Sequence, residues 1–274
     1  MKTLALHLLW WTGASRLAYA LLARRGRFVL ELHGVASRRV DELPRDAQPS
    51  FTRAELAALL EWLSPRFPFL SPEALFAGNA PGVLLTFDDG YANHVDVVLP
   101  LLEEYRASAV FFVTTRHVLD PGNWLPAVRA RRLGPLPPEL RRDLFDGMSA
   151  EQLRAAAASP LVTIGSHTVS HPFLTRLEDD ELARELADSK RFLEDATGDA
   201  VDLFAYPTGD YDRRTIAAVR DAGYRAAFVE RSRGLGGGRW EIPRVGLYSA
   251  VPAYLSAKLS GLFAGRIWRR HLAG

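Results

Sequence analysis

The chain has 274 residues, of which 48% are hydrophobic and 24% charged, so it can bury a substantial core and is not a disordered chain. Its length fits one large domain of barrel type. The formal net charge is only +2, which gives little reason to expect nucleic-acid binding. The absence of cysteine excludes disulfides and thiolate metal sites and leaves the redox compartment open.

The N-terminal segment 1–26 is predicted to form an amphipathic helix that lies on the barrel or on a bilayer surface. A spanning helix is not well supported, because His7, Gly13 and Arg16 interrupt the apolar run. Ala18-Tyr19-Ala20 resembles a signal-peptide cleavage site, although the arginines that surround it argue against one. The sequence therefore favours a cytoplasmic protein or one peripheral on the cytoplasmic membrane, and a secreted or periplasmic location stays open.

Residues 27–250 are predicted to form the main α/β domain, because apolar runs rich in β-branched or aromatic residues alternate with amphipathic stretches. The capping boxes that begin at Thr52 and Ser149 predict helix starts, and Gly198 and Gly223 predict helix ends. This alternation predicts parallel strands wrapped by helices. The seven expected strands are 27–33, 83–87, 109–114, 161–165, 202–206, 226–229 and 244–248.

Two long connections and the C-terminus stand apart from this pattern. The segment 116–148 is too long for an ordinary connection, so it is either a lid or groove wall or a surface excursion with its own short helix. R-G-L-G-G-G-R-W (233–240) predicts a flexible loop near the barrel mouth. Residues 251–274 predict a basic amphipathic helix, which could pack on the N-terminal helix or give peripheral membrane contact.

Two short motifs carry the chemistry of the chain. T-F-D-D-G (86–90) ends an apolar run, and S-H-T-V-S-H-P (166–172) follows another. One carboxylate with two imidazoles suits a divalent transition metal and leaves coordination positions open, while the second carboxylate can act as a base. If the second motif turns helically, its two imidazoles lie one above the other. A bound cation would make amide hydrolysis feasible near neutral pH.

Each motif alone has a simpler interpretation. Asp-Asp-Gly is usually a turn, and His-x-x-x-His is often a helix-surface pair or includes a core histidine. Because the two motifs occur together, in order and after predicted strands, they favour a metal site. The expected strand ends also place both at the face where barrel enzymes carry their catalytic groups.

In this order and spacing the motifs resemble the first two signatures of polysaccharide deacetylases, the NodB-homology or carbohydrate esterase family 4 group. The resemblance implies a distorted (β/α)7 barrel that removes acetyl from an N-acetylated sugar with a divalent metal. Zinc is favoured, and cobalt, nickel and iron are alternatives. It further implies that Asp88 is the base and that the metal ligands are Asp89, His167 and His171.

The third family motif is only partly matched by F-A-Y-P-T-G (204–209). Ala205 stands where the family has the arginine that steadies the base, and Thr208 stands where it has an aromatic residue. The backbone N–H of Thr208 can still take the family's oxyanion-binding role, because that role does not depend on the side chain. Arg244, in E-I-P-R-V-G-L, is a hypothetical replacement for the missing arginine.

The family's late Leu-x-His, which usually supplies the general acid, is not found near residues 245–250. His33 ends the first predicted strand and resembles the early histidine of poly-N-acetylglucosamine-type deacetylases. A protonated imidazole is well suited to deliver a proton to the departing amine, so His33 is the candidate acid. A structural histidine that caps the strand end is an equal alternative.

The remaining aromatic and histidine residues give weaker signals. Tyr206, Pro207 and Trp124 are candidate sugar contacts, with packing as the alternative for both aromatic side chains. Tyr91 is expected to pack. The other histidines have no convincing partner and are interpreted as surface or helix residues: His7, His94, His117 and His271.

The sequence thus predicts an enzyme that acts on an N-acetylated glycan. One alternative is a catalytically reduced member of the family that binds an acetylated glycan or assists its assembly at a membrane. Another is deacylation of a different amide or ester, such as a lipid-linked sugar.

Overall fold

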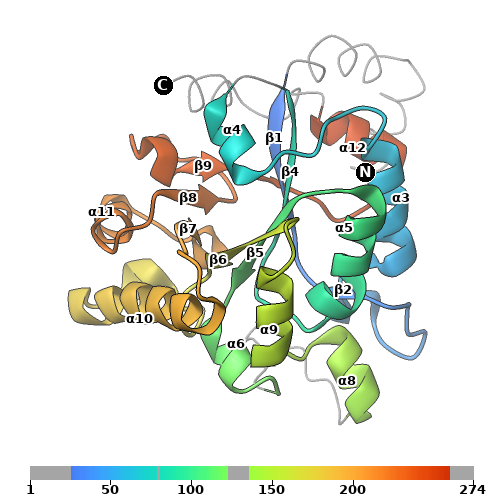
Figure 1. Ribbon diagram of the computed structural model, residues 1–274, viewed down its shortest axis with the longest axis horizontal. Helices are drawn as coiled ribbons and strands as arrows, with labels where there is room; N and C mark the ends of the chain where they lie inside the picture. Colours follow the sequence, from blue (N-terminus) through green and yellow to red (C-terminus); the bar gives the residue numbers. More distant parts are fainter. Residues whose placement is uncertain (1–25, 79–80, 123–135, 260–274) are drawn as a thin grey trace.

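The computed structural model describes residues 26–78, 81–122 and 136–259, with helices arranged around a central parallel sheet (Figure 1). The spatial order of the sheet is β10-β1-β4-β5-β6-β7-β8-β9. Its strands are β1 (Arg27–Leu32), β4 (Gly82–Phe87), β5 (Ala109–Val113), β6 (Val162–Ser166), β7 (Leu203–Ala205), β8 (Ala226–Val229), β9 (Ile242–Pro243) and β10 (Val245–Gly246). A separate two-stranded sheet pairs β2 (Val35–Ala36) with β3 (Phe51–Thr52). The predicted α/β barrel class is confirmed.

The last strand closes the barrel. The predicted strand 244–248 corresponds to β10 alone, and a further short strand, β9, precedes it, separated from β10 by Arg244. β9 pairs with β8 at one edge of the sheet, and β10 pairs with β1 at the other. One continuous segment therefore joins both edges and makes the barrel nearly closed, and the sheet has eight strands where seven were expected.

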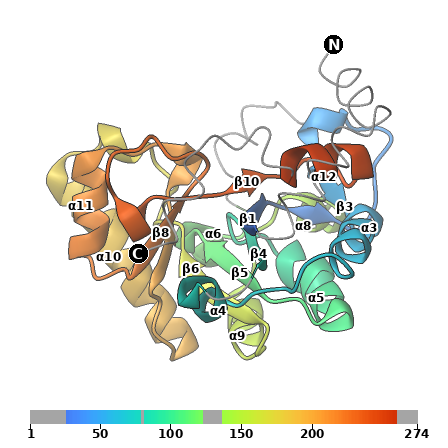
Figure 2. The same ribbon diagram turned by 90° about the horizontal axis from the view of Figure 1, so that it is seen from above.

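Helices cover the outside of the barrel. In both views α10 and α11 lie on one side and α3, α5 and α12 on the other (Figures 1 and 2). The helices are α3 (Arg53–Leu63), α4 (Pro72–Ala77), α5 (Leu99–Tyr105), α6 (Thr115–Leu119), α8 (Pro138–Leu144), α9 (Ala150–Ala157), α10 (Asp179–Thr197), α11 (Arg213–Asp221) and α12 (Pro252–Leu259). Short 3-10 turns occur at Arg45–Ala47, Leu174–Arg176, Pro207–Gly209 and Gly238–Trp240, and a π-helical turn at His94–Val98.

Local capping chemistry sets the helix boundaries where the sequence predicted it. The Thr52 and Ser149 side chains each accept a hydrogen bond from the backbone N–H three residues on, which completes two capping boxes. Gly198 ends α10 in the left-handed conformation with φ 78°, a conformation that glycine adopts without a steric penalty. These predicted starts and this predicted stop are confirmed.

Alternation along the strands divides the core into an outer and an inner part. Phe28, Leu30 and Leu32 belong to the cluster that packs on α3, whereas Val29 belongs to a second cluster with Leu84 and side chains from β5, β7, β8 and β9. The second cluster fills the barrel interior, because successive side chains of a strand point to opposite faces. The next inward positions of β1 and of the chain after β4 are Glu31 and Asp88, both buried. The barrel interior is thus apolar along most of the strands and charged where the strands reach their C-terminal ends.

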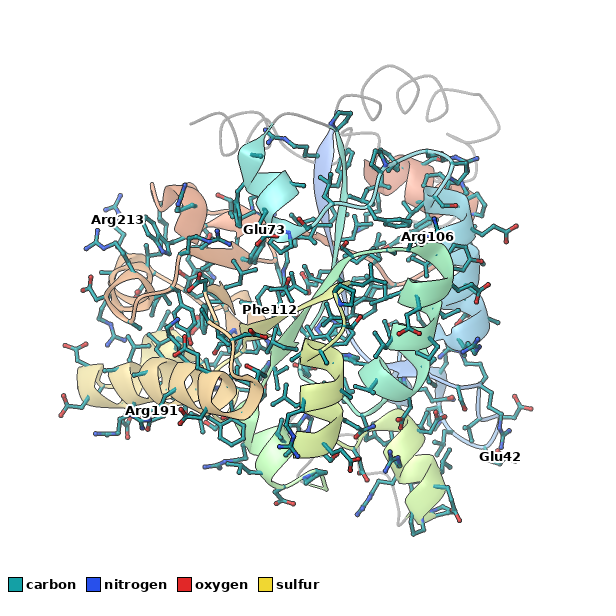
Figure 3. All side chains as sticks on the ribbon, in the orientation of Figure 1. Glu42, Glu73, Arg106, Phe112, Arg191 and Arg213 are labelled. Carbon is teal, nitrogen blue, oxygen red and sulfur yellow. The ribbon has the colours of Figure 1, made fainter. Side chains whose placement is uncertain are left out.

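Gly165 makes room for an aromatic ring in this interior. A Cβ at Gly165 would lie 2.5 Å from two ring atoms of Phe112, so β6 needs a residue without a side chain there. Phe112 is fully buried and lies near the centre of the view in Figure 3, whereas the charged side chains of Glu42, Arg191 and Arg213 lie towards its edges. The barrel interior is therefore filled by side chains and is not a channel.

The predicted flexible loop 233–240 is instead an ordered turn built around the buried carboxylate of Glu241. Glu241 Oε1 accepts hydrogen bonds from the amides of Arg233 and Gly234, each at 2.8 Å, and from the hydroxyl of Tyr211 at 2.8 Å. Burial by itself raises the pKa of Glu241, but hydrogen bonds from the Tyr211 hydroxyl and from the amides of Leu235 and Gly237 outweigh it and lower the pKa to about 2. The glycines supply positive φ angles, and the carboxylate fixes the turn.

The predicted terminal helices fall largely outside the described residues, as does Trp124 in the predicted lid. The described part of the C-terminal segment is α12, whose Ala253, Leu255 and Leu259 are buried against the barrel. Among the described ranges, no helix is both long and apolar enough to cross a bilayer.

Candidate metal centre

The strand ends bring the two motifs to one level of the barrel. Leu32 is the register partner of Phe87, and Val113 is the partner of Ser166. His33, Asp88 and His167 therefore each stand one residue beyond a strand, and the backbone N–H groups of Asp88 and His167 continue the ladder to Leu32 and Val113, both at 3.0 Å. Parallel register thus places residues that are far apart in sequence around one mouth.

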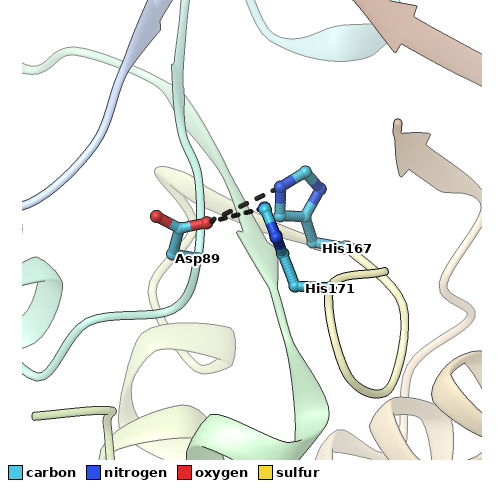
Figure 4. Close-up of side chains that lie close together, drawn as sticks. All are labelled: Asp89, His167 and His171. Carbon is cyan, nitrogen blue, oxygen red and sulfur yellow. Dashed lines mark ion pairs between the residues drawn. The ribbon is translucent and has the colours of Figure 1, made fainter. Parts of the chain in front are cut away.

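Asp89, His167 and His171 converge at this mouth (Figure 4). The Oδ1 atom of Asp89 lies 3.6 Å from Nε2 of His167 and 3.6 Å from Nε2 of His171. One ligand atom from each residue lies within 4.8 Å of the other two. The set offers one oxygen and two nitrogens with a common focus, which is the donor type that zinc and neighbouring transition metals accept.

The Oδ1 atom of Asp89 is suited to bind a cation because no other group in the described part of the chain satisfies it. Asp89 Oδ1 is buried and has no hydrogen-bond donor among the described residues. Burial on its own raises the pKa of Asp89, but the imidazoles of His33 and His171 outweigh it and lower the pKa. A buried, ionised oxygen without a donor is costly, and a divalent cation would remove that cost.

The ring of His167 is set in the tautomer that a ligand needs. Its Nδ1–H donates to the carbonyl of Ala205 at 2.8 Å, which leaves the Nε2 lone pair towards Asp89. Burial, only partly offset by Asp88, lowers the pKa of His167 to about 4, so this imidazole is neutral at pH 7. Ala205, where the family has an arginine side chain, thus contributes through its main chain.

The second motif does not turn helically between its two histidines. Residues 167–172 form an irregular loop in which Thr168 and His171 are left-handed, with φ 71° and 58°. The loop, rather than i, i+4 helical geometry, brings the second ring next to the first, with ring centroids 4.9 Å apart. Left-handed backbone at residues other than glycine is strained and must be held by its surroundings.

Arg244 binds Asp88 through both terminal nitrogens of its guanidinium group. Its Nη1 and Nη2 donate to Oδ1 and Oδ2 of Asp88 at 2.6 and 2.7 Å, and its Nε lies 3.5 Å from Oε2 of Glu31. All three side chains are buried. Burial on its own raises the pKa of Asp88, but the Arg244 charge outweighs it and holds the pKa well below 3.8, so the carboxylate is ionised at neutral pH.

Glu31 is a third carboxylate at the mouth, and it was missed by the sequence interpretation. Its signal was available: a charged residue within an apolar strand, V-L-E-L, must find a buried partner. Burial, which the Arg244 charge partly offsets, raises the pKa of Glu31. Glu31 and Asp88 lie on either side of Arg244, and its single positive charge is the countercharge of both carboxylates.

His33 lies at the rim of this acidic group with 42% of its side chain exposed. Its Nε2 is 4.0 Å from Oε1 of Glu31. Partial burial lowers the pKa of His33, but the carboxylates of Asp89 and Asp88 outweigh this effect and the pKa rises above 6.5. The imidazole can therefore reach both solvent and the charged groups of the mouth.

The third motif separates into exposed and buried residues. Thr208 is exposed and left-handed, with φ 57°, three residues beyond the end of β7. Tyr206 is only 1% exposed and donates its hydroxyl to the carbonyl of Trp240 at 3.0 Å, and Pro207 is buried. Tyr206 and Pro207 thus occupy core positions, and neither presents a face to a sugar in this conformation.

Two histidines interpreted as surface or helix residues lie in helical segments, His117 in α6 and His94 in the π-helical turn, but neither is at the surface. His117 is 1% exposed, and its Nδ1–H donates to the carbonyl of Asp89 at 3.2 Å. His94 is fully buried against the rings of Phe87 and Phe111, and burial lowers its pKa to about 3. His117 thus supports the backbone of Asp89, and His7 and His271 lie outside the described residues.

The fold and the site define a class: a parallel barrel with a carboxylate and two imidazoles gathered at its C-terminal mouth, where they could hold a metal. The chain belongs to the polysaccharide deacetylase family, whose profile matches residues 77–227.

Individual relatives are more distant. The chain is 25% identical to YxkH of Bacillus subtilis over 143 residues, which cover 52% of this chain and 42% of YxkH. It is 26% identical to the peptidoglycan-N-acetylglucosamine deacetylase of Bacillus cereus, over 54% of this chain and 55% of that protein. The chain thus spans about half the length of these relatives. Among solved structures it resembles IcaB from Ammonifex degensii, with a TM-score of 0.65, 23% identity, and coverage of 86% of this chain and 97% of IcaB.

Proposed function

We propose that this protein is a metal-dependent carbohydrate N-deacetylase that hydrolyses the acetamide of an N-acetylhexosamine in a polysaccharide or glycolipid. The observation that carries the proposal is the convergence of Asp89, His167 and His171 on one focus beside the ionised Asp88. Zinc is the metal proposed, because nitrogen and oxygen donors with an open position suit it. When bound, such a cation acidifies water and polarises a carbonyl.

The residues of the chain divide the proton transfers between them. Asp88, held in place by Arg244, accepts a proton from the attacking water. The Thr208 amide donates to the oxygen that gains charge as the carbonyl is attacked. His33 gives its proton to the nitrogen as the C–N bond breaks, so acetate and a free amine leave.

The proposed substrate follows from the family and from the site. The family name and the named activity of the Bacillus cereus relative support an N-acetylated sugar polymer. His33, which comes early in the chain, supports a site of the poly-N-acetylglucosamine type. The buried positions of Tyr206 and Pro207 leave the sugar contacts to other residues at the mouth.

Acetate release from an N-acetylglucosamine oligomer tests the proposal. Purified protein should contain about one equivalent of metal and release acetate, and Asp89→Ala should lose both the metal and the activity. Asp195→Ala, an exposed position on α10, is the control and should keep both. If the wild-type protein releases no acetate with any metal at any pH, the proposal is contradicted and a glycan-binding protein is favoured. The specific indication for that alternative is Ala205, which stands where the family has an arginine.

His33→Ala should lower kcat by about 10²–10⁴-fold, the usual contribution of a general acid, while metal content stays at the wild-type level. Metal analysis and steady-state kinetics on the same preparation give both values. Loss of metal from His33→Ala would instead assign His33 as a ligand, and an unchanged kcat would leave it a structural residue.

A further inference from the structure

The loop that carries the two metal-binding histidines has two strained residues and little regular structure. Thr168 and His171 both adopt left-handed φ angles, which are strained for residues other than glycine. No hydrogen bond joins the ring of His171 to another described residue, whereas the ring of His167 is held by the Ala205 carbonyl. The position of the His171 ring therefore depends on the backbone of the loop.

A single carboxylate from the neighbouring helix holds that backbone. Glu185 Oε2 accepts hydrogen bonds from the amides of Val169 and Ser170 at 2.8 and 2.9 Å, and its Oε1 accepts one from the Ser170 hydroxyl at 2.6 Å. These are the two residues between the strained Thr168 and His171. Hydrogen bonds to an ionised acceptor are roughly twice as strong as neutral ones.

The rest of the loop is tied from the opposite side. The carbonyls of Thr168 and Val169 accept from the amides of Thr115 and Arg116 at the start of α6, at 3.1 and 2.9 Å. The Thr168 hydroxyl in turn accepts from the amide of His171 at 2.9 Å. The backbone of Val169 is thus hydrogen-bonded to α10 through its N–H and to α6 through its carbonyl. These contacts set the position of His171, two residues on.

We propose that Glu185 is the positioning residue that sets His171 for metal binding, acting through the amides of Val169 and Ser170. The inference rests on the proposed metal site and assigns to α10 a role in it. Outer partners of this kind typically change metal affinity by 10–100-fold. Glu185 does not touch the metal focus, so its effect acts through loop geometry.

The variants needed for a test are expected to fold. A pocket of about 370 Å³, lined among others by Val169, Ser170 and Glu185, opens on the outer side of the loop. Water can therefore reach the two amides when the carboxylate is removed, which limits the cost of leaving them without an acceptor. Asp188, which lines the same pocket and forms an ion pair with Arg191 at 2.7 Å, gives a matched control on the same helix.

Zinc dissociation constants, measured by competition with a chromophoric chelator, test the proposal without relying on activity. Glu185→Ala should bind zinc about 10–100-fold more weakly than wild type. Glu185→Gln, which can still accept from both amides, should recover most of that loss, and Asp188→Ala should match wild type. Equal constants for Glu185→Ala and wild type, or an equal loss in Asp188→Ala, would overturn the proposal.

Hydrogen exchange on the metal-free proteins separates this inference from the proposed function. The amides of Val169 and Ser170 should be protected in wild type and in Asp188→Ala and should exchange much faster in Glu185→Ala. If wild type binds no zinc, the proposed function fails, while the exchange result still decides whether Glu185 holds the loop. Unchanged exchange at both amides would overturn the role of Glu185 even if zinc binds.

Discussion

At the scale of single residues, Arg244 determines the ionisation and the orientation of Asp88, the proposed base. Its guanidinium is buried between Asp88 and Glu31 and donates two short hydrogen bonds to Asp88. A lysine could supply the charge but not the two parallel hydrogen bonds. The family arginine is missing at Ala205, and a residue 39 positions later in the sequence reaches the same kind of carboxylate.

Arg244→Met should lower the free energy of unfolding by about 3–5 kcal/mol, because it leaves two buried carboxylates without their countercharge. Urea unfolding at pH 7 measures this loss. Arg244→Lys should lose less stability but still show a clear fall in kcat, since Asp88 is no longer held at two points. Wild-type kcat in both variants would show that the arginine only stabilises the fold.

The roles of some site residues could be predicted from the sequence, and those of others could not. Asp89, His167 and His171 could be grouped in advance because their motifs follow strand ends, and the structure does bring them together. Glu185 and His117 could not be found this way, because their partners are backbone groups of loops whose course depends on the whole fold. Tyr206 fits a sugar-binding pattern but lies in the core.

At the scale of elements, the turn from Ser232 to Glu241 shows how one carboxylate can order a glycine-rich segment. The glycines allow the left-handed angles, and the sequence alone indicated only this freedom. The Glu241 carboxylate, reached by four backbone amides within the turn and by Tyr211 and Ser232, selects one conformation. This turn leads directly into β9 and so positions Arg244.

The stability contributed by Glu241 should depend on pH. Its folded pKa of about 2 lies below its ordinary value of 4.5, so the contribution is fully present above about pH 4.5 and is lost as the pH falls towards 2. Glu241→Gln should therefore destabilise the protein by about 2–3 kcal/mol at pH 7, and the difference from wild type should shrink at pH 3. Urea midpoints at both pH values measure it.

Glu61→Gln, at an exposed position on α3, is the control and should leave the midpoints unchanged at both pH values. A difference between wild type and Glu241→Gln that is the same at pH 7 and pH 3 would show that the turn does not depend on the charge of this carboxylate.

At the scale of the whole molecule, the closed barrel assembles the proposed metal site, and a bound ion would in turn stabilise the barrel. β9, Arg244 and β10 join the two edges of the sheet, and the same segment delivers the countercharge of Asp88 into the mouth. The ligand set comes from the ends of β4 and β6, so a bound ion would tie separate strands together. Binding to the folded state alone raises its stability by mass action.

Zinc at about 100 times its dissociation constant should therefore stabilise the protein by about 2.7 kcal/mol and raise Tm by roughly 5–10 °C. A chelator should reverse the shift, and Asp89→Ala should show none. Differential scanning fluorimetry with and without zinc measures it. The same shift in Asp89→Ala would place the stabilising ion elsewhere.

The sequence by itself determined the alternation of strands and helices, the capped helix ends and the two motifs of the proposed metal site. These features depend on local propensity and on motifs at strand ends, which neighbouring residues encode. Only the tertiary structure decided that Arg244 reaches Asp88, that Glu185 holds the histidine loop and that Tyr206 is buried. Such contacts join segments far apart in the chain, and their geometry exists only once the barrel has closed.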